Sequence, residues 1–496
     1  MSIDPLRAEK RAALAAAGLD PFAPERFERT HGAADIRDRF AEVGDASLRV
    51  AGRIVSQRSN FFDIEDASGR GQVYLDKSAM DPALHALLKS NLDLGDFVGV
   101  EGTVFETKAG DKALRAEKVV PLAKALRDAG AVLGKEYRDE ATGSLKRRDH
   151  LQDPEQRYRL RYCDLFVNSE ARDVLVKRIR VTRAIREFLD QRGYLEVETP
   201  VLHHEAGGAH ARPFRTRHNA LGLDLHLRIA LELHLKRLIV GGLEKVFEIG
   251  RVFRNEGIST RHNPEFSLLE LYEAYTNLEG MMELVESMFR HISVAVNGSE
   301  ILVTPDGTEV DLSKPWTRLP MLEGIERNAG IAPDRFENLA SAKAAMEQVG
   351  LDASTEFSVG GIIEKIHEQF TQPTLVQPTF ITDFPIETSP LARKVPGNPR
   401  LTRRFESYVL RQEIGNAFSE INDPVDQRER FEDQVRQKEQ GDAEAQPMDE
   451  DFLRALEYGM PPTGGFGMGI DRVAMIFTGA ESIRDVLFFP LLRPER

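Results

Sequence analysis

The chain has 496 residues, of which 41% are hydrophobic and 29% charged, and its formal net charge is −14. This length exceeds what one hydrophobic core supports, so we expect two or more folding units, and the composition excludes a mainly disordered or collagen-like chain. The single cysteine, Cys163, excludes an intramolecular disulfide and a multi-cysteine zinc site. Because the net charge is negative, the overall charge gives no support for nucleic-acid binding, although a local binding site stays open.

The hydropathy pattern and the first residues predict a cytoplasmic protein. No apolar run approaches the roughly 18 residues needed to cross a bilayer, so no membrane partner is expected. Residues 1–20 carry Asp4, Glu9 and Asp20 and lack the apolar core of a secretion signal. We expect an amphipathic helix there, within an N-terminal helical extension over residues 1–45.

Residues 46–125 contain short runs rich in β-branched and aromatic residues, and turn signals separate these runs. Five such strands predict a small barrel of the OB-fold type, which often binds single-stranded nucleic acid on its surface. A plain barrel without a ligand is the alternative. Residues 126–160 lose this periodicity and are rich in charged and turn residues, which predicts a linker with an insertion near residues 128–150.

The remaining residues, 161–496, open with apolar positions at helical spacing, and Gly193 ends this helix before the strand-like run YLEVETP. Two further strands, VFEIGRVFR and FSLLELYEAY, are joined by NEGISTRHNPE, a connection longer than a usual hairpin loop. On the second of these strands Glu270 and Tyr272 share one face, because side chains alternate along a strand. We infer that this long loop and this polar face are functional.

The same alternation in EIGNAFSEIND places Asn416, Phe418 and Glu420 on one face, which is a poor core surface because a buried carboxylate needs a partner. A glycine-rich loop, GGFGMGIDR, precedes an apolar helical pattern near the C-terminus. It does not indicate a dinucleotide-binding fold, because too little chain follows for another βαβ unit. A metal site at His203, His204 and His210 is disfavoured, since adjacent histidines on a strand point to opposite sides.

Taken together, RVTRAIREFLDQRGYLEVETP, FEIGRVFRNEGISTRHNPEF and GFGMGIDRVAMIF resemble motifs 1, 2 and 3 of class II aminoacyl-tRNA synthetases. The runs GGAHARPF, ELHLKRL, LLELYEAY, QPTFITDFPIETSPLAR and EIGNAFSEINDP narrow the resemblance to class II lysyl-tRNA synthetases, over nearly the whole chain. The resemblance implies an α+β protein, with an N-terminal OB-fold β-barrel that binds the anticodon and a catalytic domain on an antiparallel six-stranded sheet. It also implies a homodimer with motif 1 at the interface.

The resemblance further implies ATP-dependent activation of L-lysine to lysyl-adenylate, and then transfer to the terminal adenosine of tRNA(Lys). Arg254 and Arg472 match the catalytic positions. The ATP-binding positions are matched by Arg254, Glu256, Arg261, His262, Phe266 and Arg472. The lysine-binding positions are matched by Glu232, Glu270, Tyr272, Asn416, Phe418 and Glu420.

Two more sets of positions follow from the resemblance. Glu406 and Glu413 match acidic positions that hold Mg²⁺ against the triphosphate, as hard oxygen ligands suit that ion. Arg58, Phe61 and Gln72 match positions that read the anticodon through stacking and hydrogen bonds to bases. Packing in the barrel core is the alternative for Phe61.

Several alternatives stay open at this stage. An aspartyl- or asparaginyl-type relative is disfavoured because an aspartate pocket would need a cation, and the matching positions here are acidic. A catalytically silent RNA-binding module is disfavoured because Arg254 and Arg472 are present. The glutamates could pair with nearby cations, and Glu232 beside Lys236 and Arg237 at helical spacing is the clearest case.

The chain also departs from the family pattern. Where the family usually has R-I-A-P-E-L-Y, this chain reads RIALELH, with Leu231 and His234 on either side of Glu232. VLRQE stands before Ile414 in place of a bacterial pattern with two glycines and an arginine. The hairpin SQRSNFFDIED is shorter than its counterpart in the family.

Overall fold

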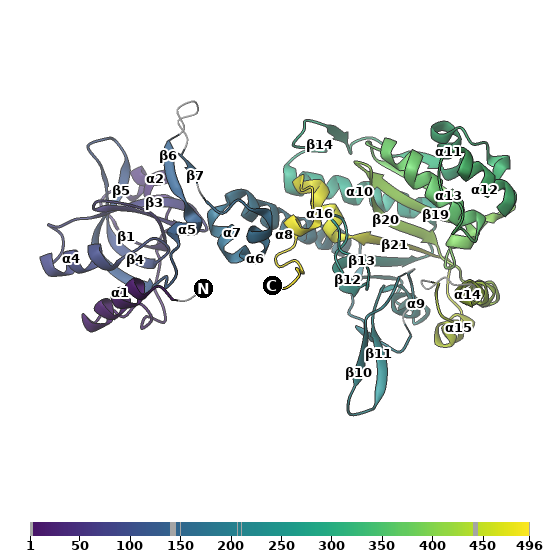
Figure 1. Cartoon of the computed structure of the whole chain (residues 1–496), viewed down its shortest axis with the longest axis horizontal. Coiled ribbons are helices and arrows are strands. Elements are labelled where there is room, and N and C mark those ends of the chain that lie inside the picture. Colours follow the sequence, from purple (N-terminus) through teal and green to yellow (C-terminus); the bar gives the residue numbers. More distant parts are fainter. Residues whose placement is uncertain are drawn as a thin grey trace. The chain divides into compact units, whose positions relative to one another are not determined.

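The structure is a computed structural model, and it describes residues 3–138, 145–148, 150–205, 207–209, 211–439 and 445–495. The chain divides into two compact units, Met1–Ser169 and Glu170–Arg496 (Figure 1). In the part of the chain that the structure describes, no helix is long and apolar enough to cross a membrane.

The first unit is built on a closed five-stranded barrel with the strand order β1-β2-β3-β5-β4. The strands are β1 (Ser47–Arg58), β2 (Phe61–Asp66), β3 (Gly69–Leu75), β4 (Phe97–Glu106) and β5 (Lys112–Ala123). Along β1 and β2 buried residues largely alternate with partly exposed ones, and the inward side chains, such as Val50, Phe62 and Val100, form the core. The OB-fold expected from the sequence is therefore present.

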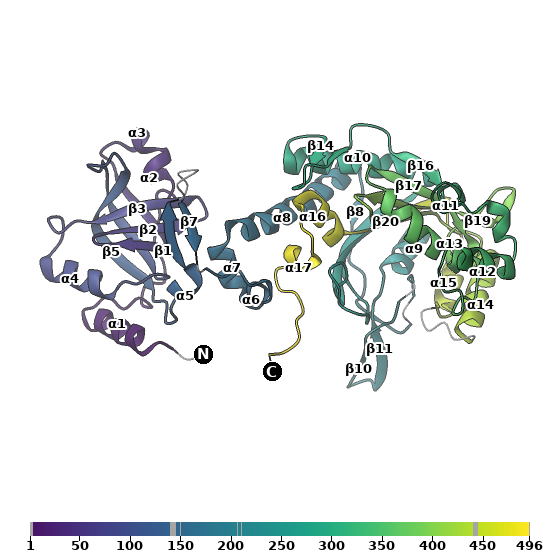
Figure 2. The ribbon, with the colours of Figure 1, turned by 45° about the horizontal axis from the view of Figure 1, so that its top comes forward.

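Helices close this barrel and extend it. They are α1 (Pro5–Ala16), α2 (Asp35–Asp38), α3 (Phe40–Val43), α4 (Pro82–Asn91), α5 (Gly130–Leu133), α6 (Pro154–Arg159) and α7 (Arg161–Val167). Helix α1 packs against α4 (Figure 2), and Arg7 fixes it there by donating to the carbonyl oxygens of Leu94 and Ala125. The N-terminal extension is thus part of the barrel unit.

The insertion near residues 128–150 contains an antiparallel strand pair, β6 (Lys135–Arg138) with β7 (Leu145–Arg148). The sequence predicted a linker there and no strands, because this stretch has the composition of turns. Residues 139–144 and 149 of the insertion lie outside the described part.

A nine-stranded sheet forms the centre of the second unit. Its main path runs β16-β17-β19-β20-β21-β13-β12-β8, and β18 pairs with β19. The bounds are β8 (Leu195–Glu196), β12 (Lys245–Phe253), β13 (Glu265–Ala274), β16 (Thr317–Pro320), β17 (Thr379–Pro385), β18 (Lys394–Val395), β19 (Asn398–Val409), β20 (Gln412–Ser419) and β21 (Thr463–Gly469). From β17 to β12 every neighbouring pair is antiparallel, and the outer strands β16 and β8 pair in parallel.

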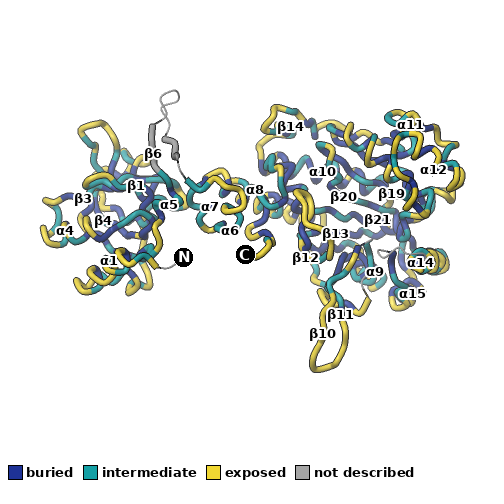
Figure 3. The backbone as a smooth tube through the Cα atoms, in the orientation of Figure 1, coloured by how far each residue is buried: buried dark blue, intermediate teal, exposed yellow. Residues whose placement is uncertain are grey.

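Helices and small hairpins surround this sheet (Figure 1). The helices are α8 (Ser169–Asp190), α9 (Glu232–Val240), α10 (Leu278–Asn297), α11 (Met321–Ala329), α12 (Leu339–Gln348), α13 (Val359–Ile366), α14 (Pro424–Glu439), α15 (Glu450–Glu457), α16 (Ile470–Thr478) and α17 (Ile483–Val486). The short strands are β9 (Leu202–His203), β10 (Arg215–His218), β11 (Leu223–Leu227), β14 (Ile301–Val303) and β15 (Glu309–Asp311). The tip of the β10–β11 hairpin is exposed, in contrast to the buried central strands (Figure 3).

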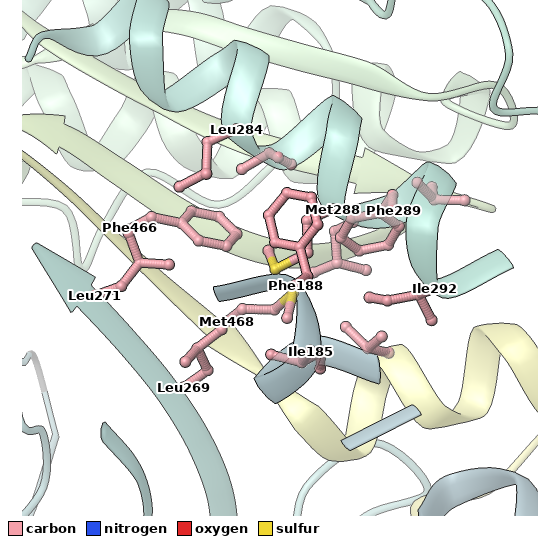
Figure 4. Packing of buried hydrophobic residues seen from close by; sticks show 14 of the residues in the cluster. Ile185, Phe188, Leu269, Leu271, Leu284, Met288, Phe289, Ile292, Phe466 and Met468 are labelled. Carbon is pink, nitrogen blue, oxygen red and sulfur yellow. The ribbon is translucent and has the colours of Figure 1, made fainter. Parts of the chain in front are cut away.

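The two faces of the sheet have different side chains. On one face, Leu269 and Leu271 of β13 pack with Phe466 of β21 against helices α8 and α10 (Figure 4). Because side chains alternate along a strand, Glu270 and Tyr272 of β13 point to the other face. The apolar face thus anchors the sheet to the core, and the opposite face is left for a polar site.

Candidate active site

A cavity of about 1180 Å³ lies in the second unit, on the polar face of the sheet. All the residues that the sequence predicted to bind the amino acid, ATP or a metal line this cavity, although they come from positions between 232 and 472. Their contacts divide it into an acidic end around Glu270 and Glu420, and an end rich in arginine around Arg254 and Arg472. The anticodon-reading candidates belong to the other unit.

Glycines of β21 make room for the acidic end. The register places Gly465 opposite both Tyr272 and Phe418 on the two neighbouring strands. A Cβ atom on Gly465 would lie 2.1 Å from Oε1 of Glu420 and 2.5 Å from the Tyr272 ring. The sequence predicted a glycine-rich loop here, which is wrong, since these glycines lie in a central strand. Their lack of side chains is required by the neighbours that face the cavity.

At the acidic end, Glu270 is buried and held by two donors. Its Oε1 accepts a hydrogen bond from the backbone N–H of Leu231 at 3.0 Å, and its Oε2 accepts one from the Tyr272 hydroxyl at 3.0 Å. Burial, together with the nearby charge of Glu232, raises the pKa of Glu270 to about 8. A proline at position 231, the usual residue in the family pattern, would have no N–H to donate. The departure at Leu231 therefore fixes Glu270.

Two further glutamates complete this end. Glu232 starts α9, and its Oε1 accepts from Lys236 Nζ at 2.5 Å, which confirms the alternative that this glutamate pairs with a nearby cation. Glu420 follows β20 and also pairs with Lys236. Burial raises the pKa of Glu420 to about 8, against the opposing effect of Lys236. Oε1 of Glu420 accepts no hydrogen bond from any residue that the structure describes.

Arg254, Phe266 and Arg472 form the opposite end of the cavity. The guanidinium of Arg254 stacks over the Phe266 ring at 5.1 Å from its centroid. Arg472 donates from Nη1 to Oε2 of Glu413 at 2.8 Å, and its Nη2 lies 3.4 Å from Nε2 of His262. These cations and this aromatic face suit a nucleotide with its phosphates.

His262 lies in the long loop between β12 and β13. Its Nδ1 lies 2.9 Å from Oγ of Ser259, and its own backbone N–H donates to the same oxygen at 3.0 Å. Burial, and then the charge of Arg472, lowers the pKa of His262, which keeps the ring neutral near pH 7. The loop is therefore held in a defined conformation around Ser259, whose Oγ also accepts from the Arg261 N–H.

Glu406 and Glu413 lie on the neighbouring strands β19 and β20. Oε1 of Glu406 accepts from Arg404 at 2.6 Å, and its Oε2 accepts from the Tyr408 hydroxyl at 2.6 Å. Burial, and then the charge of Glu413, raises the pKa of Glu406 to about 7. Such a repelling pair of carboxylates fits Mg²⁺, which proteins usually bind through one or two carboxylates together with substrate phosphates.

Elsewhere the described residues do not gather into a metal site. Among them no group of three or more His, Cys, Asp and Glu side chains could hold an ion. Nε2 of His203 lies 2.9 Å from the carbonyl oxygen of Pro200, and its ring packs against that of His234 at 4.6 Å. His210 lies outside the described residues.

Sequence reasoning missed two residues that organise the cavity. Arg404 donates to Glu406 and, from Nε, to Oδ1 of Asn416 at 3.1 Å, so it links the two ends. Tyr408 donates to Glu406 and also lies 3.3 Å from Nε2 of the buried His367. Their spacing gave a usable signal, because positions 404, 406 and 408 share one face of a strand.

The barrel carries a separate row of aromatic rings. Phe61 packs against Tyr74 at 4.7 Å between centroids, and Tyr74 contacts Phe105 at 5.8 Å. Phe61 is partly exposed, and its neighbour Phe62 fills the core, so the core alternative for Phe61 is wrong. Gln72 shares a strand face with Tyr74, and Arg58 pairs with Phe61 in the register, which brings the three predicted residues together.

The chain matches known proteins over almost its full length. The family model described as tRNA synthetases class II (D, K and N) matches residues 153–493, and the OB-fold nucleic acid binding domain model matches residues 48–122. A Thermoanaerobacter sp. protein named Lysine–tRNA ligase is 47% identical over 494 residues, which cover 99% of this chain and 96% of the relative. A protein of the same name from Moorella thermoacetica is 48% identical over 495 residues, covering 99% and 97%.

Proposed function

The chain belongs to the class II tRNA synthetases of the D, K and N group, and on this premise we propose that it is a ligase for lysine and tRNA(Lys). It activates L-lysine with ATP to form lysyl-adenylate and pyrophosphate, and then transfers the lysyl group to the terminal adenosine of the tRNA. The observation that supports lysine within this group is the acidic end of the cavity, with Glu232, Glu270 and Glu420. An ammonium group suits these carboxylates, whereas the side chain of aspartate would be repelled.

Activation forms one bond and breaks another at the α-phosphorus. An oxygen of the lysine carboxylate attacks it, and the bond to the pyrophosphate oxygen breaks, so the electron pair leaves with pyrophosphate. Arg254 stabilises the charge that develops there, because its half-buried side chain lines the cavity and its guanidinium is already oriented over Phe266. Phe266 provides the stacking face for adenine. Arg261 and Arg472 hold the triphosphate, and Glu256 and His262 lie near the adenine and ribose end of ATP.

Glu406 and Glu413 would hold Mg²⁺, which when bound supplies charge neutralisation of the triphosphate. Arg404 and Tyr408 orient Glu406 from behind through the two hydrogen bonds that its oxygens accept. In the second step a ribose hydroxyl of the tRNA attacks the carbonyl carbon of the adenylate. The bond from this carbon to the phosphate oxygen breaks, AMP leaves with that electron pair, and the proton of the hydroxyl passes to the departing phosphate.

We further propose that the barrel binds the anticodon and that the protein forms a homodimer. Phe61 and Tyr74 offer a stacking platform, with Arg58 and Gln72 beside it for base edges and phosphates. Helix α8 exposes Ile179 at 52%, directly before motif 1, where a partner copy would cover it. As working domain limits we propose residues 1–45, 46–125, 126–160 and 161–496.

The experiment is lysine-dependent exchange of pyrophosphate into ATP, measured on the wild type and two variants. Glu420→Gln should raise the lysine KM far more than the ATP KM, because losing one partner of a desolvated charge pair costs about 2 to 5 kcal/mol. Arg254→Ala should lower kcat by roughly 10² or more, since it removes a preorganised group at the reacting phosphate. Exchange that depends on aspartate or asparagine in place of lysine would refute the proposal.

A separate variant tests the barrel. Phe61→Ala should weaken charging of tRNA by roughly 5- to 150-fold, corresponding to about 1 to 3 kcal/mol of stacking, and leave tRNA-independent exchange intact. Thermal unfolding is measured on the same preparation. A variant of normal stability with unchanged charging would show that the anticodon is read elsewhere.

A further inference from the structure

Lys236 is a fully buried cation directly behind the acidic end of the cavity. Its side chain has no exposed surface, and it is absent from the residues that line the cavity. Its Nζ pairs with Glu232 at 2.5 Å and with Glu420, and it lies 5.9 Å from the ring centroids of Tyr272 and Phe452. A lysine in such surroundings is costly to bury unless its partners are fixed, so these contacts hold both carboxylates in place.

We propose that Lys236 is a positioning residue for amino-acid recognition, whose ammonium fixes Glu232 and Glu420 and sets the charge of the acidic end to match two ammonium groups. This inference rests on the proposed function and deepens it. The inference identifies the ligand feature that the site recognises, which is a pair of ammonium groups on one amino acid.

Counting charges supports this match. When all three carboxylates of the acidic end are ionised, the ammonium of Lys236 neutralises one of them, which leaves two negative charges. Free L-lysine carries two ammonium groups, so the sum at this end becomes zero when it binds. The remaining carboxylate of the ligand faces Arg254. Without Lys236, one negative charge would stay buried with no counter-ion, which is strongly unfavourable.

The two carboxylate oxygens of Glu420 have different surroundings. Neither oxygen of Glu420 accepts a hydrogen bond of normal geometry from a described residue, but Lys236 forms an ion pair with Oε2, whereas Oε1 faces Gly465. The protein therefore holds one oxygen and leaves the other for the substrate. If Lys236 were absent, Glu420 could rotate, and the unused oxygen would lose its fixed direction.

The groups that face Lys236 come from every element around it, and their charges determine how the site titrates. Glu232 lies on the same helix and Glu420 follows β20, and both pair with Lys236. Tyr272 of β13 and Phe452 of α15 present their rings to it, and Glu270 of β13 acts on Glu232 and Glu420. The charge of Lys236 lowers the pKa of Glu420 against the larger effect of burial. Removing Lys236 should therefore raise this pKa above about 8 and leave less of the carboxylate ionised at neutral pH.

The test is Lys236→Met, which keeps the length of the side chain and removes its charge. At a pH below the pKa of Glu420, each unit by which this pKa rises lowers the ionised fraction of the carboxylate by about tenfold. We therefore expect the lysine KM to rise about tenfold or more at neutral pH. The ATP KM should stay within about twofold, because ATP binds at the other end. The increase in lysine KM should shrink as the pH is raised, since alkaline solution restores the carboxylate.

Arg237→Met is the matched control, because Arg237 lies on the same helix and its ion pair with Asp449, at 3.1 Å, is outside the cavity. Its lysine KM and pH profile should follow the wild type. Lys236→Gln, which is smaller and cannot overpack, gives the same readout if the methionine variant does not fold.

The outcomes separate the two proposals. If the wild type shows lysine-dependent exchange and the Lys236 variants keep its lysine KM, or change it by the same factor at every pH, Lys236 has only a structural role and this inference is wrong. If the wild type shows no lysine-dependent exchange, the proposed function is wrong and this inference fails with it.

Discussion

Gly465→Ala adds a single methyl group at the place where the acidic end has no spare room. The new Cβ would lie 2.1 Å from Oε1 of Glu420 and 2.5 Å from the Tyr272 ring. Position 465 is in a central strand paired on both sides, so its backbone cannot shift easily. The glutamate must move instead, and losing its contact with an ammonium costs about 2 to 5 kcal/mol, or roughly 30- to 5000-fold in lysine KM.

The assay is pyrophosphate exchange at varied lysine and then at varied ATP, with thermal unfolding on the same samples. We expect the lysine KM to rise within this range and the ATP KM to change little, because the methyl is far from the arginine-rich end. Gly467→Ala is the stability control on the same strand, since its Cβ would meet no atom closer than 3.5 Å. A Gly465→Ala protein that folds and keeps the wild-type lysine KM would refute the placement of the ammonium at Glu420.

Three further predictions use other parts of the structure. The lysine KM should fall as the pH rises to about 8 and then level off. The reason is that Glu270 and Glu420 have pKa values of about 8, and the ammonium groups bind their ionised forms. A flat profile in exchange assays would contradict this. Tyr408→Phe removes a donor to Glu406, so the Mg²⁺ concentration for half-maximal exchange should rise by roughly 10- to 150-fold, equivalent to about 1.5 to 3 kcal/mol. An unchanged Mg²⁺ titration would exclude this role for the hydroxyl. Ser59→Gly should stabilise the barrel by up to about 1 kcal/mol, because this exposed turn residue has φ +54°, and chemical unfolding that shows a loss of stability would refute the strain.

Side-chain alternation and motif spacing were enough to predict much of the site. The alternation in β13 predicted that Glu270 and Tyr272 share a face, and the hydrogen bond between them follows from that placement. The five strands of the barrel were also predictable, since each has turn residues at its ends. The roles of these residues in binding rest on the family resemblance, because spacing alone does not identify a ligand.

Other features depended on contacts between distant segments. In the sequence Gly465 looks like part of a loop. The need for glycine at this position of a central strand comes from the side chains of Glu420 and Tyr272, which lie far from it in the chain. The partner of Glu232 on its own helix was foreseeable from the spacing of four, whereas the second contact of Lys236, with Glu420, joins segments far apart in the chain. Patterns of hydropathy and spacing within one segment do not predict pairs between segments that are far apart in the chain.

The most direct test of the central claim is acylation of tRNA(Lys) by the purified protein, with lysine, aspartate and asparagine supplied separately as the amino acid. The acidic end of the cavity predicts that lysine is attached in the presence of ATP and that the other two are not, because neither of them brings a second ammonium group to Glu270 and Glu420. Attachment of aspartate or asparagine, or no attachment of lysine by a folded protein that binds ATP, would contradict the account.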